Sequence, residues 1–350
     1  MPAEQETRPA CQRMFWEGVD RHGRVIYFLP PHPLSHRRDM LVVHDWVKNP
    51  DLYEMSGKGT ISNLGPDGRA ILYRNYLNNK SLGFRQDWKR LWGSKQGKTC
   101  LLVSCGPSLR ESLPEIRELA ADKSRYFTFG INRAIRALPL DLYMASDRRA
   151  SCGYGASDWM PATNPKDTTL IAATTVPSEI PRRFRPDNVY WGEGVRAEES
   201  GDATNLASLL TITICDAIIA AYKLGAGRVL LYGCDYALTA TQEGDKADGG
   251  RPREEYYYFD TLADKGMEVH RIAYPENYPV KDRFGGLCLT NWELLCNAAY
   301  TACAAYMLER AGIPVENRSR FGLLWESWKE PGLGNNVSDA VPVCSAAVPG

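Results

Sequence analysis

The sequence predicts an α/β fold in which a mostly parallel β-sheet carries helices on both faces. Short apolar runs recur along the chain, and they alternate with segments in which apolar residues repeat with helical spacing. Buried parallel strands have this continuous apolar character, and crossover helices connect them. The pattern holds over residues 96–325, which is long enough to enclose one large hydrophobic core.

The first predicted strand, residues 99–104, begins where the sequence changes from mixed polar to apolar. A helix is expected at 109–121, a short helix at 133–138 and two long apolar helices at 205–224 and 292–310. The remaining predicted strands are residues 126–131, 141–146, 169–173, 188–191, 228–232 and 313–316. Strands that alternate with helices in this way favour parallel pairing in one sheet.

Residues 1–95 lack this alternation, and we expect them to form an N-terminal extension or small subdomain. A hairpin is predicted over residues 14–29 and a short aromatic helix over 86–92, with Gly65 and Gly68 marking turns between them.

Two polar segments lie within or after the predicted domain. Residues 240–255 are rich in glycine and charge and form a candidate mobile lid. Residues 326–350 are predicted to be a C-terminal tail.

Composition argues against several classes of protein. Lys and Arg together number 42, and so do Asp and Glu, so no overall charge indicates a polyanionic partner. None of the ten cysteines forms a C-x-x-C pair, and several lie in apolar runs, which indicates reduced thiols. His32 and His36 have ligand spacing, but Pro31 and Pro33 preclude a regular helix there, so no metal site is predicted.

The sequence also carries a prediction about location. No charged-then-apolar leader opens the chain, and no stretch approaches the run of about 18 apolar residues that a transmembrane helix requires. We therefore expect a cytoplasmic protein without a transmembrane segment.

The clearest chemical signal is the turn Cys105-Gly106-Pro107-Ser108, which follows the first strand and precedes a helix. In doubly wound sheets, ligands bind outside the carboxyl ends of the strands. Gly106 would let a ligand approach the backbone, Ser108 would cap the helix, and free N–H groups would attract an anion. Neither the G-x-G-x-x-G fingerprint nor a Walker lysine is present, which argues against a dehydrogenase and a P-loop kinase. A tight structural turn is the alternative interpretation.

Polar residues follow three further predicted strands. Asn132 comes after the second strand, Asp147 and Arg148 after the third, and Asp235 and Tyr236 after the sixth. The carboxyl ends of parallel strands meet at one edge of the sheet, so these side chains are expected to line one crevice. Each taken singly is explained as an ordinary cap or turn, but together they favour a nucleotide-binding site.

The sequence resembles a Rossmann-like superfamily that joins three families. The resemblance is carried by three segments in this order: GPSL, GINRAI…LPLDLYMASD and KLGAGRVLLYGCDYAL. The three families are the bacterial motility accessory factor glycosyltransferases, the bacterial sialyltransferases that use CMP-sialic acid, and the archaeal 6-hydroxymethylpterin diphosphokinase-like proteins. The resemblance covers residues 100–325 and includes GIPVENRSRFGLL, which is similar to the closing strand and Asn-x-Ser turn of these families. It implies a Rossmann-like domain that binds a nucleotide or a nucleotide-linked substrate.

Residue by residue, the resemblance implies that Gly106, Pro107 and Ser108 wrap the nucleotide and that Asn132 contacts it. It also implies that Asp147 stands at the polar end of the third strand.

The resemblance extends to three later positions. Thr213 lies where the sialyltransferases begin a helix with Thr-Ser-Gly, although Ile214 replaces the glycine. Asp235 corresponds to the aspartate of the Gly-x-Asp motif. Tyr236 is one position away from the tyrosines that these enzymes place on the donor phosphate, and Tyr256, Tyr257 or Tyr258 is an alternative.

The sequence differs from the superfamily's motifs at two places, and these differences bear on whether the chain is a diphosphokinase or a sialyltransferase. The diphosphokinases carry paired aspartates for Mg²⁺ at the third strand, whereas this chain has Asp147 followed by Arg148 and Arg149, which suits an anionic substrate better. The sialyltransferases have a catalytic histidine before the penultimate helix, and residues 285–291 contain none. His270 lies earlier in the chain, so Asp147, Asp235 and His270 are all candidates for the catalytic base.

The leading hypothesis is therefore a sialyltransferase-like glycosyltransferase that takes a sugar from a CMP-linked, or a UDP- or GDP-linked, donor. The acceptor (a glycan, a protein or a nucleic acid) and the oligomeric state are left open, and no cofactor is expected beyond the nucleotide-sugar substrate. One alternative is a diphosphokinase that acts on a pterin-like alcohol with ATP and Mg²⁺. Another is a non-catalytic nucleotide-binding protein.

An aromatic and basic string near residues 73–92 stands apart from these motifs. It consists of Tyr73, Arg74, Tyr76, Arg85, Trp88, Lys89, Arg90 and Trp92. Such a string can stack on and neutralise a nucleic acid or a glycan. A buried aromatic core with a charged rim is the favoured interpretation.

Overall fold

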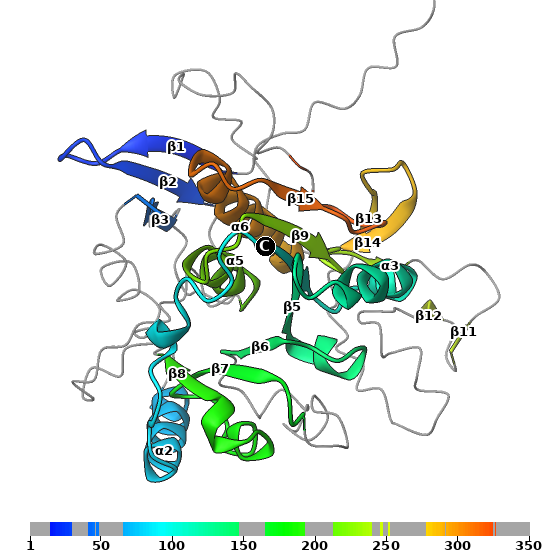
Figure 1. The fold of residues 1–350 in the computed structure, drawn as a ribbon. Coiled ribbons are helices and arrows are strands. Elements are labelled where there is room, and N and C mark those ends of the chain that lie inside the picture. The colour runs from blue at the N-terminus through cyan, green and yellow to red at the C-terminus, as the bar shows by residue number, and fades with distance from the viewer. Residues whose placement is uncertain are drawn as a thin grey trace, which may run out of the picture.

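The computed structural model describes residues 15–29, 41–45, 47–48, 66–146, 165–192, 213–239, 246–247, 251–252, 278–290, 292–324 and 326. Within them the chain forms a seven-stranded parallel sheet in the order β15-β9-β4-β5-β6-β7-β8 (Figure 1). The strands are β4 (Thr99–Val103), β5 (Tyr126–Ile131), β6 (Leu142–Ala145), β7 (Thr169–Ala173), β8 (Val189–Gly192), β9 (Arg228–Tyr232) and β15 (Val315–Asn317). The predicted α/β, Rossmann-like class is confirmed.

Strand β4 lies where the order of the strands reverses. The chain moves outward from β4 through β5, β6 and β7 to β8, and then returns to place β9 and β15 on the other side of β4. In a doubly wound sheet this reversal opens a crevice outside the carboxyl ends of the two central strands. The turns after β4 and β9 are therefore the expected place for a ligand.

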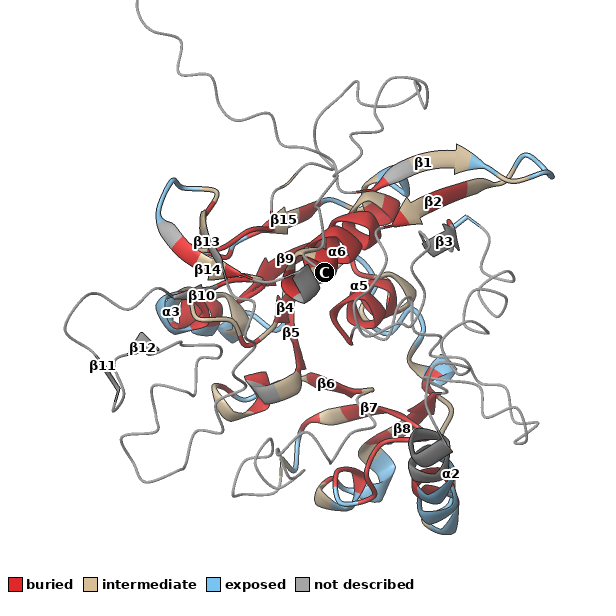
Figure 2. Cartoon of the chain, turned by 180° about the vertical axis from the view of Figure 1, so that it is seen from behind, coloured by how far each residue is buried: buried red, intermediate tan, exposed pale blue. Residues whose placement is uncertain are grey.

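Both faces of the sheet are covered. Side chains of a strand alternate between faces, so Cys100 and Leu102 pack in one buried cluster while Leu101 and Val103 pack in another. The first cluster contains α5 (Thr213–Lys223) and α6 (Trp292–Arg310), and the second contains α3 (Leu109–Ala121). The strands are accordingly buried along their length (Figure 2).

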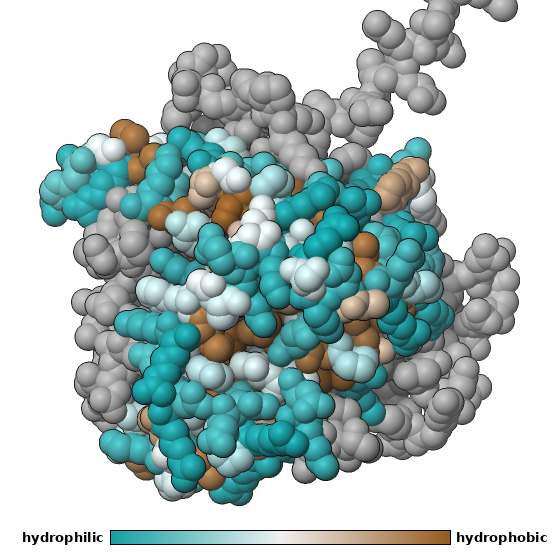
Figure 3. Space-filling view, viewed as in Figure 1, coloured by the Kyte–Doolittle hydropathy of each residue, from teal (hydrophilic) through white to brown (hydrophobic). Residues whose placement is uncertain are grey.

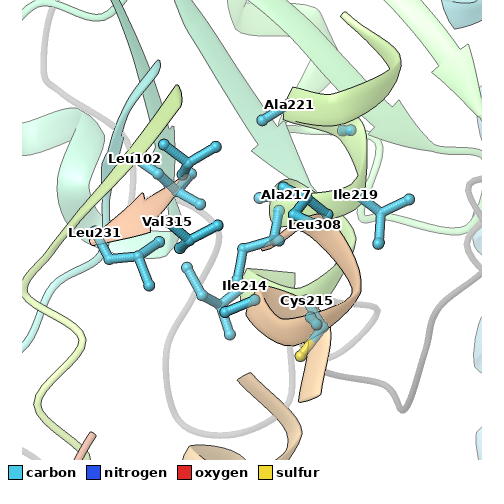
Figure 4. Close-up of a cluster of buried hydrophobic side chains, with 14 of the residues drawn as sticks. Leu102, Ile214, Cys215, Ala217, Ile219, Ala221, Leu231, Leu308 and Val315 are labelled. Carbon is cyan, nitrogen blue, oxygen red and sulfur yellow. The ribbon is translucent and has the colours of Figure 1, made fainter. Parts of the chain in front are cut away.

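A close-up of the first cluster shows side chains of α5 and α6 beside those of the sheet (Figure 4). Leu102, Leu231 and Val315 come from adjacent strands, and all three are fully buried. Buried apolar area of this kind is the dominant stabilising contribution to a fold of this size.

The N-terminal strands β1 (Trp16–Val19), β2 (Val25–Leu29) and β3 (Leu41–His44) form an antiparallel sheet, which confirms the predicted hairpin. Phe15 and Tyr27 belong to the same buried cluster as α6, and the Tyr27 hydroxyl donates to Asp45 over 2.9 Å. The hairpin therefore packs beside α6 (Figure 1). The boundaries predicted for the N-terminal extension and the C-terminal tail stay predictions.

Helix α2 (Pro66–Ser81) was not expected, and the turn predicted at Gly68 is wrong because Gly68 lies inside this helix. Pro66 at its first position suits a helix start. The side-chain amide of Asn75 donates to the Thr175 carbonyl, and that of Asn79 to the carbonyls of Thr174 and Val176. These contacts are distant in sequence, so a local pattern does not reveal the helix.

Smaller elements complete the described chain. The predicted aromatic helix is the 3-10 turn η2 (Trp88–Leu91), and the helix predicted at 133–138 is the 3-10 turn η3 (Asn132–Arg136). Two further 3-10 turns are η4 (Pro181–Arg183) and η5 (Pro186–Asn188). Strands β10 (Leu238–Thr239), β13 (Tyr278–Lys281) and β14 (Leu287–Thr290) form an antiparallel sheet, and β11 (Lys246–Ala247) pairs with β12 (Arg251–Pro252).

The face in Figure 3 is mostly hydrophilic, and its apolar residues form small patches. Among the helices of the described segments, none has the length and hydropathy to cross a membrane.

The amide contacts of α2 lead to a prediction. Asn79 is fully buried, and Asn79→Ala would leave the carbonyls of Thr174 and Val176 without their donor. We expect a loss of about 1–3 kcal/mol in the free energy of unfolding, measured by urea titration. The neighbouring exposed Asn78→Ala is the matched control and should change stability little. Equal effects of the two substitutions would contradict the proposed role of Asn79.

Candidate functional site

The turn after β4 lies against the end of β9. The N–H of Ser104 donates to the Tyr232 carbonyl over 2.8 Å, and the N–H of Gly106 donates to the Gly233 carbonyl over 2.9 Å. Helix α3 begins immediately afterwards at Leu109. The turn thus occupies the point where the strand order reverses.

Asp235 joins this turn to the loop after β9. Its carboxylate accepts the Ser108 N–H over 2.7 Å at Oδ2 and the Ser108 hydroxyl over 2.6 Å at Oδ1. Only 1% of Asp235 is exposed. A helix N-terminus favours a negative charge, and here the chain supplies that charge itself. We refer to this pair of hydrogen bonds as the Asp235–Ser108 clasp.

The clasp corrects the capping role expected for Ser108 and adds a packing reason for the glycine at position 106. Ser108 stands at the N-cap position of α3, but its side chain bonds Asp235 and makes no capping hydrogen bond to the helix. Gly106 was expected to make room for a ligand. A Cβ there would lie 2.6 Å from both Asp235 Oδ2 and the Gly233 carbonyl oxygen, so the chain's own packing already requires glycine.

The closing segment of the domain covers the clasp. The Cys234 N–H donates to the Ser319 hydroxyl over 2.8 Å, and the Leu323 N–H donates to the Asp235 carbonyl over 2.7 Å. Asn317 accepts the Ser319 N–H, so the predicted Asn-x-Ser turn is present. Apart from the Asn-x-Ser motif, the sequence gives no local sign that this turn supports Asp235.

Burial raises the pKa of Asp235 to about 7, while hydrogen bonds from Ser108 and the nearby Arg283 oppose the shift. A pKa near neutrality suits a general base, but a base must also reach the proton that it removes. Asp235 is enclosed, and both of its carboxylate oxygens already accept hydrogen bonds. Its geometry therefore favours positioning the turn over taking a proton from a substrate.

Asn132 offers the accessible polar group beside the turn. Val103 of β4 pairs with Gly130 of β5, so Asn132 and the turn follow neighbouring strand ends. Asn132 has a φ of 49°, a left-handed conformation that asparagine tolerates better than most residues, and it is half-buried. Its carbonyl accepts the Tyr143 hydroxyl, whereas its side-chain amide has no hydrogen bond to any described residue.

Ser146 and Thr213 extend the same edge. Ile131 of β5 pairs with Met144 of β6, which places Ser146 beside the end of β5. The Ser146 hydroxyl donates to Thr213 Oγ1 over 2.8 Å, so the start of the described part of α5 meets the end of β6. The structure therefore brings the ends of β4, β5 and β6 together with Thr213.

Tyr236 and Cys105 were predicted to contact the nucleotide, but both are directed into the fold. The Tyr236 hydroxyl lies 2.5 Å from Thr301 Oγ1 on α6, and burial raises its pKa well above the usual range. Cys105 is 2% exposed. Both residues pack within the fold, although Tyr236, with a φ of 54°, is a second non-glycine residue in the left-handed region at a strand end.

Several site predictions lie outside the described residues. These are Asp147, Arg148 and His270, together with most of the predicted lid at 240–255. In the part of the chain that the structure describes, no group of His, Cys, Asp and Glu side chains is arranged to hold a metal ion. The described cysteines form no disulfide with one another, and Cys296 and Cys303 are both buried on α6.

Comparisons with known proteins complete the description. The chain matches no protein-family model and no curated protein sequence. Among solved structures it is similar to the MAf glycosyltransferase from Magnetospirillum magneticum AMB-1, with a TM-score of 0.43 and 17% sequence identity. The similarity covers 73% of this chain and 38% of that protein, so the chain spans well under half of the length of that structure.

The buried carboxylate predicts a pH dependence of stability. The pKa of Asp235 is about 7 in the folded chain and 3.8 ordinarily, so the folded state binds this proton more tightly than the unfolded state does. The free energy of unfolding should therefore fall as the pH rises from about 4 to about 7, by on the order of 4 kcal/mol from this group.

Asp235→Asn tests this assignment. The amide has the same shape, and it can accept the Ser108 N–H and donate to the Ser108 hydroxyl. We expect the variant to fold and its stability to change less between pH 4 and pH 7 in urea titrations. Asp187→Asn, at an exposed position, is the control and should keep the wild-type profile. An unaltered profile in Asp235→Asn would overturn the assignment.

Proposed function

We propose that the chain is a glycosyltransferase that binds a nucleotide-activated sugar in the crevice outside β4, β5 and β6. The observation that carries the proposal is Asn132, whose side-chain amide has no hydrogen bond to a described residue and stands at the carboxyl end of β5, beside the turn after β4. A strained backbone at such an edge is typical of functional sites. The reaction class comes from the order of sequence motifs that resemble nucleotide-sugar enzymes.

The lining of the crevice supports a nucleoside as the bound group. An amide donates and accepts hydrogen bonds, which suits the edge of a base or a ribose. Gly106 and Pro107 are partly accessible at the turn, while the clasp beneath them is closed to solvent. We assign nucleotide contact to Gly106, Pro107, Asn132, Ser146 and Thr213, and support of the turn to Ser108 and Asp235.

Transfer of a sugar also needs stabilisation of the leaving phosphate and a base for the acceptor hydroxyl. We propose Arg148 for the first role, because guanidinium groups match phosphate geometry. Asp147 and His270 are the proposed bases, since the enclosed Asp235 is a poor one. The proposal requires no metal ion.

A nucleotide panel tests the proposal directly. We expect CMP, UDP or GDP to raise the melting temperature without added Mg²⁺, by several degrees at a ligand concentration about 100 times the Kd. Stabilisation by ATP alone, and only with Mg²⁺, would favour a phosphoryl transferase instead. The absence of stabilisation by any nucleotide would contradict both functions. Tight binding without transfer to any acceptor would indicate a non-catalytic binding protein.

Asn132→Gly separates a ligand contact from a turn residue. Glycine adopts the left-handed φ of 49° without strain, so the substitution removes the amide and preserves the backbone. We expect nucleotide affinity to fall by about 1–3 kcal/mol in calorimetry, with a nearly unchanged melting temperature. Asn78→Ala, on the exposed face of α2, should leave affinity as in the wild type. Unchanged affinity in Asn132→Gly would remove Asn132 from the site.

A further inference from the structure

Basic residues gather at the amino ends of the parallel strands, the edge of the sheet opposite the proposed nucleotide site. Residues 88–98 contain Lys89, Arg90, Lys95 and Lys98 and no acidic residue, although the whole chain is balanced at 42 basic and 42 acidic residues. This segment leads into β4 at Thr99, so it lies at the amino ends of the parallel strands. It continues the cyan part of the chain that follows α2 in Figure 1.

Tertiary contacts bring two more lysines to this segment. The Gly93 N–H donates to the Lys223 carbonyl over 3.0 Å, at the end of α5. The Lys98 ammonium donates to the Lys123 carbonyl over 2.8 Å, in the turn before β5. We call the resulting surface the basic edge, defined by Lys89, Arg90, Lys95, Lys98, Lys123 and Lys223.

A tryptophan stands among these cations. Trp92 is 44% exposed, whereas Trp88 is 4% exposed and packs in the core. The ammonium groups of Lys89 and Lys223 lie 6.0 Å and 5.1 Å from the centre of the Trp92 ring. The structure thus divides the aromatic string of the sequence into a buried part and an exposed part.

Lys95 lies close to other charged groups. Burial is the main cause that lowers its pKa; Asp141 opposes the shift, and Lys98 and Lys123 add smaller contributions to it. Asp141 itself bonds the Lys123 ammonium and the backbone of Thr128. An anionic partner would relieve the repulsion among the remaining cations.

We propose that the basic edge docks on an anionic membrane surface, with the lysines and arginine on lipid phosphates and Trp92 at the level of the headgroups. Tryptophan prefers the membrane–water interface, and clustered basic residues bind anionic leaflets. A single-stranded nucleic acid would instead use several exposed aromatic rings for successive bases, and on the described part of this edge Trp92 is exposed while Tyr126 and Tyr222 are only partly so. Docking by this edge leaves the crevice at the carboxyl ends open.

Vesicle sedimentation tests the proposal with the full chain. We expect binding to phosphatidylcholine vesicles that contain phosphatidylglycerol, weaker binding in high salt, and none to phosphatidylcholine alone. Each basic residue near an anionic membrane contributes about 1 kcal/mol, so the triple variant Lys89→Gln, Arg90→Gln, Lys98→Gln should bind about a hundredfold more weakly. Trp92→Ala should weaken binding by a smaller factor.

A charge-matched control makes the test specific. Arg21→Gln, Arg110→Gln and Arg320→Gln remove three charges from exposed positions outside the basic edge and should leave vesicle binding as in the wild type. Melting temperatures of both triple variants should match the wild type, which excludes unfolding as the cause. The proposal is overturned by equal losses in the two variants, by binding that ignores lipid charge, or by no binding. Salt-sensitive binding of a single-stranded oligonucleotide through Lys89, Arg90 and Lys98, without vesicle binding, would also overturn it.

Discussion

The arrangement of the turns after β4 and β9 depends on one buried carboxylate. Asp235 accepts two hydrogen bonds from Ser108 and so ties the start of α3 to the end of β9. Its burial is costly, and the hydrogen bonds and the dipole of α3 offset that cost. Two neighbouring positions, 106 and 322, are glycines, and a Cβ at either Gly106 or Gly322 would collide with Asp235. The closing segment adds a backbone hydrogen bond from Leu323.

This arrangement divides the polar strand ends into two layers. The inner layer, Ser108 and Asp235, is closed to solvent and links the ends of two strands through hydrogen bonds. The outer layer, which includes Gly106, Asn132 and Ser146, remains partly accessible. A ligand at the reversal of the strand order therefore meets the outer layer, since the Ser108 N–H at the start of α3 already bonds Asp235. Such rigid support beneath a contact layer is what an organised binding site requires.

The two edges of the sheet differ in chemistry for a topological reason. All seven strands of the main sheet are parallel, so the loops that follow them collect at one edge and the loops that precede them at the other. The first edge gathers amide and hydroxyl groups, and the second gathers Lys95, Lys98 and Lys123. A chain with balanced charge thus presents two surfaces of different character.

The sequence by itself determined the α/β class and most elements of the sheet domain, because apolar runs and helical spacing are local signals. Strands β5, β7 and β9 and helices α3 and α6 have the bounds that their periodicity predicts. It also determined which strand ends carry polar residues. Only the tertiary structure decided what those residues do. Asp235 became an enclosed support, and Trp92 was exposed where Trp88 was buried. Helix α2 formed against carbonyls about a hundred residues away. Burial and hydrogen-bond partners depend on contacts between distant segments, and no local pattern encodes them.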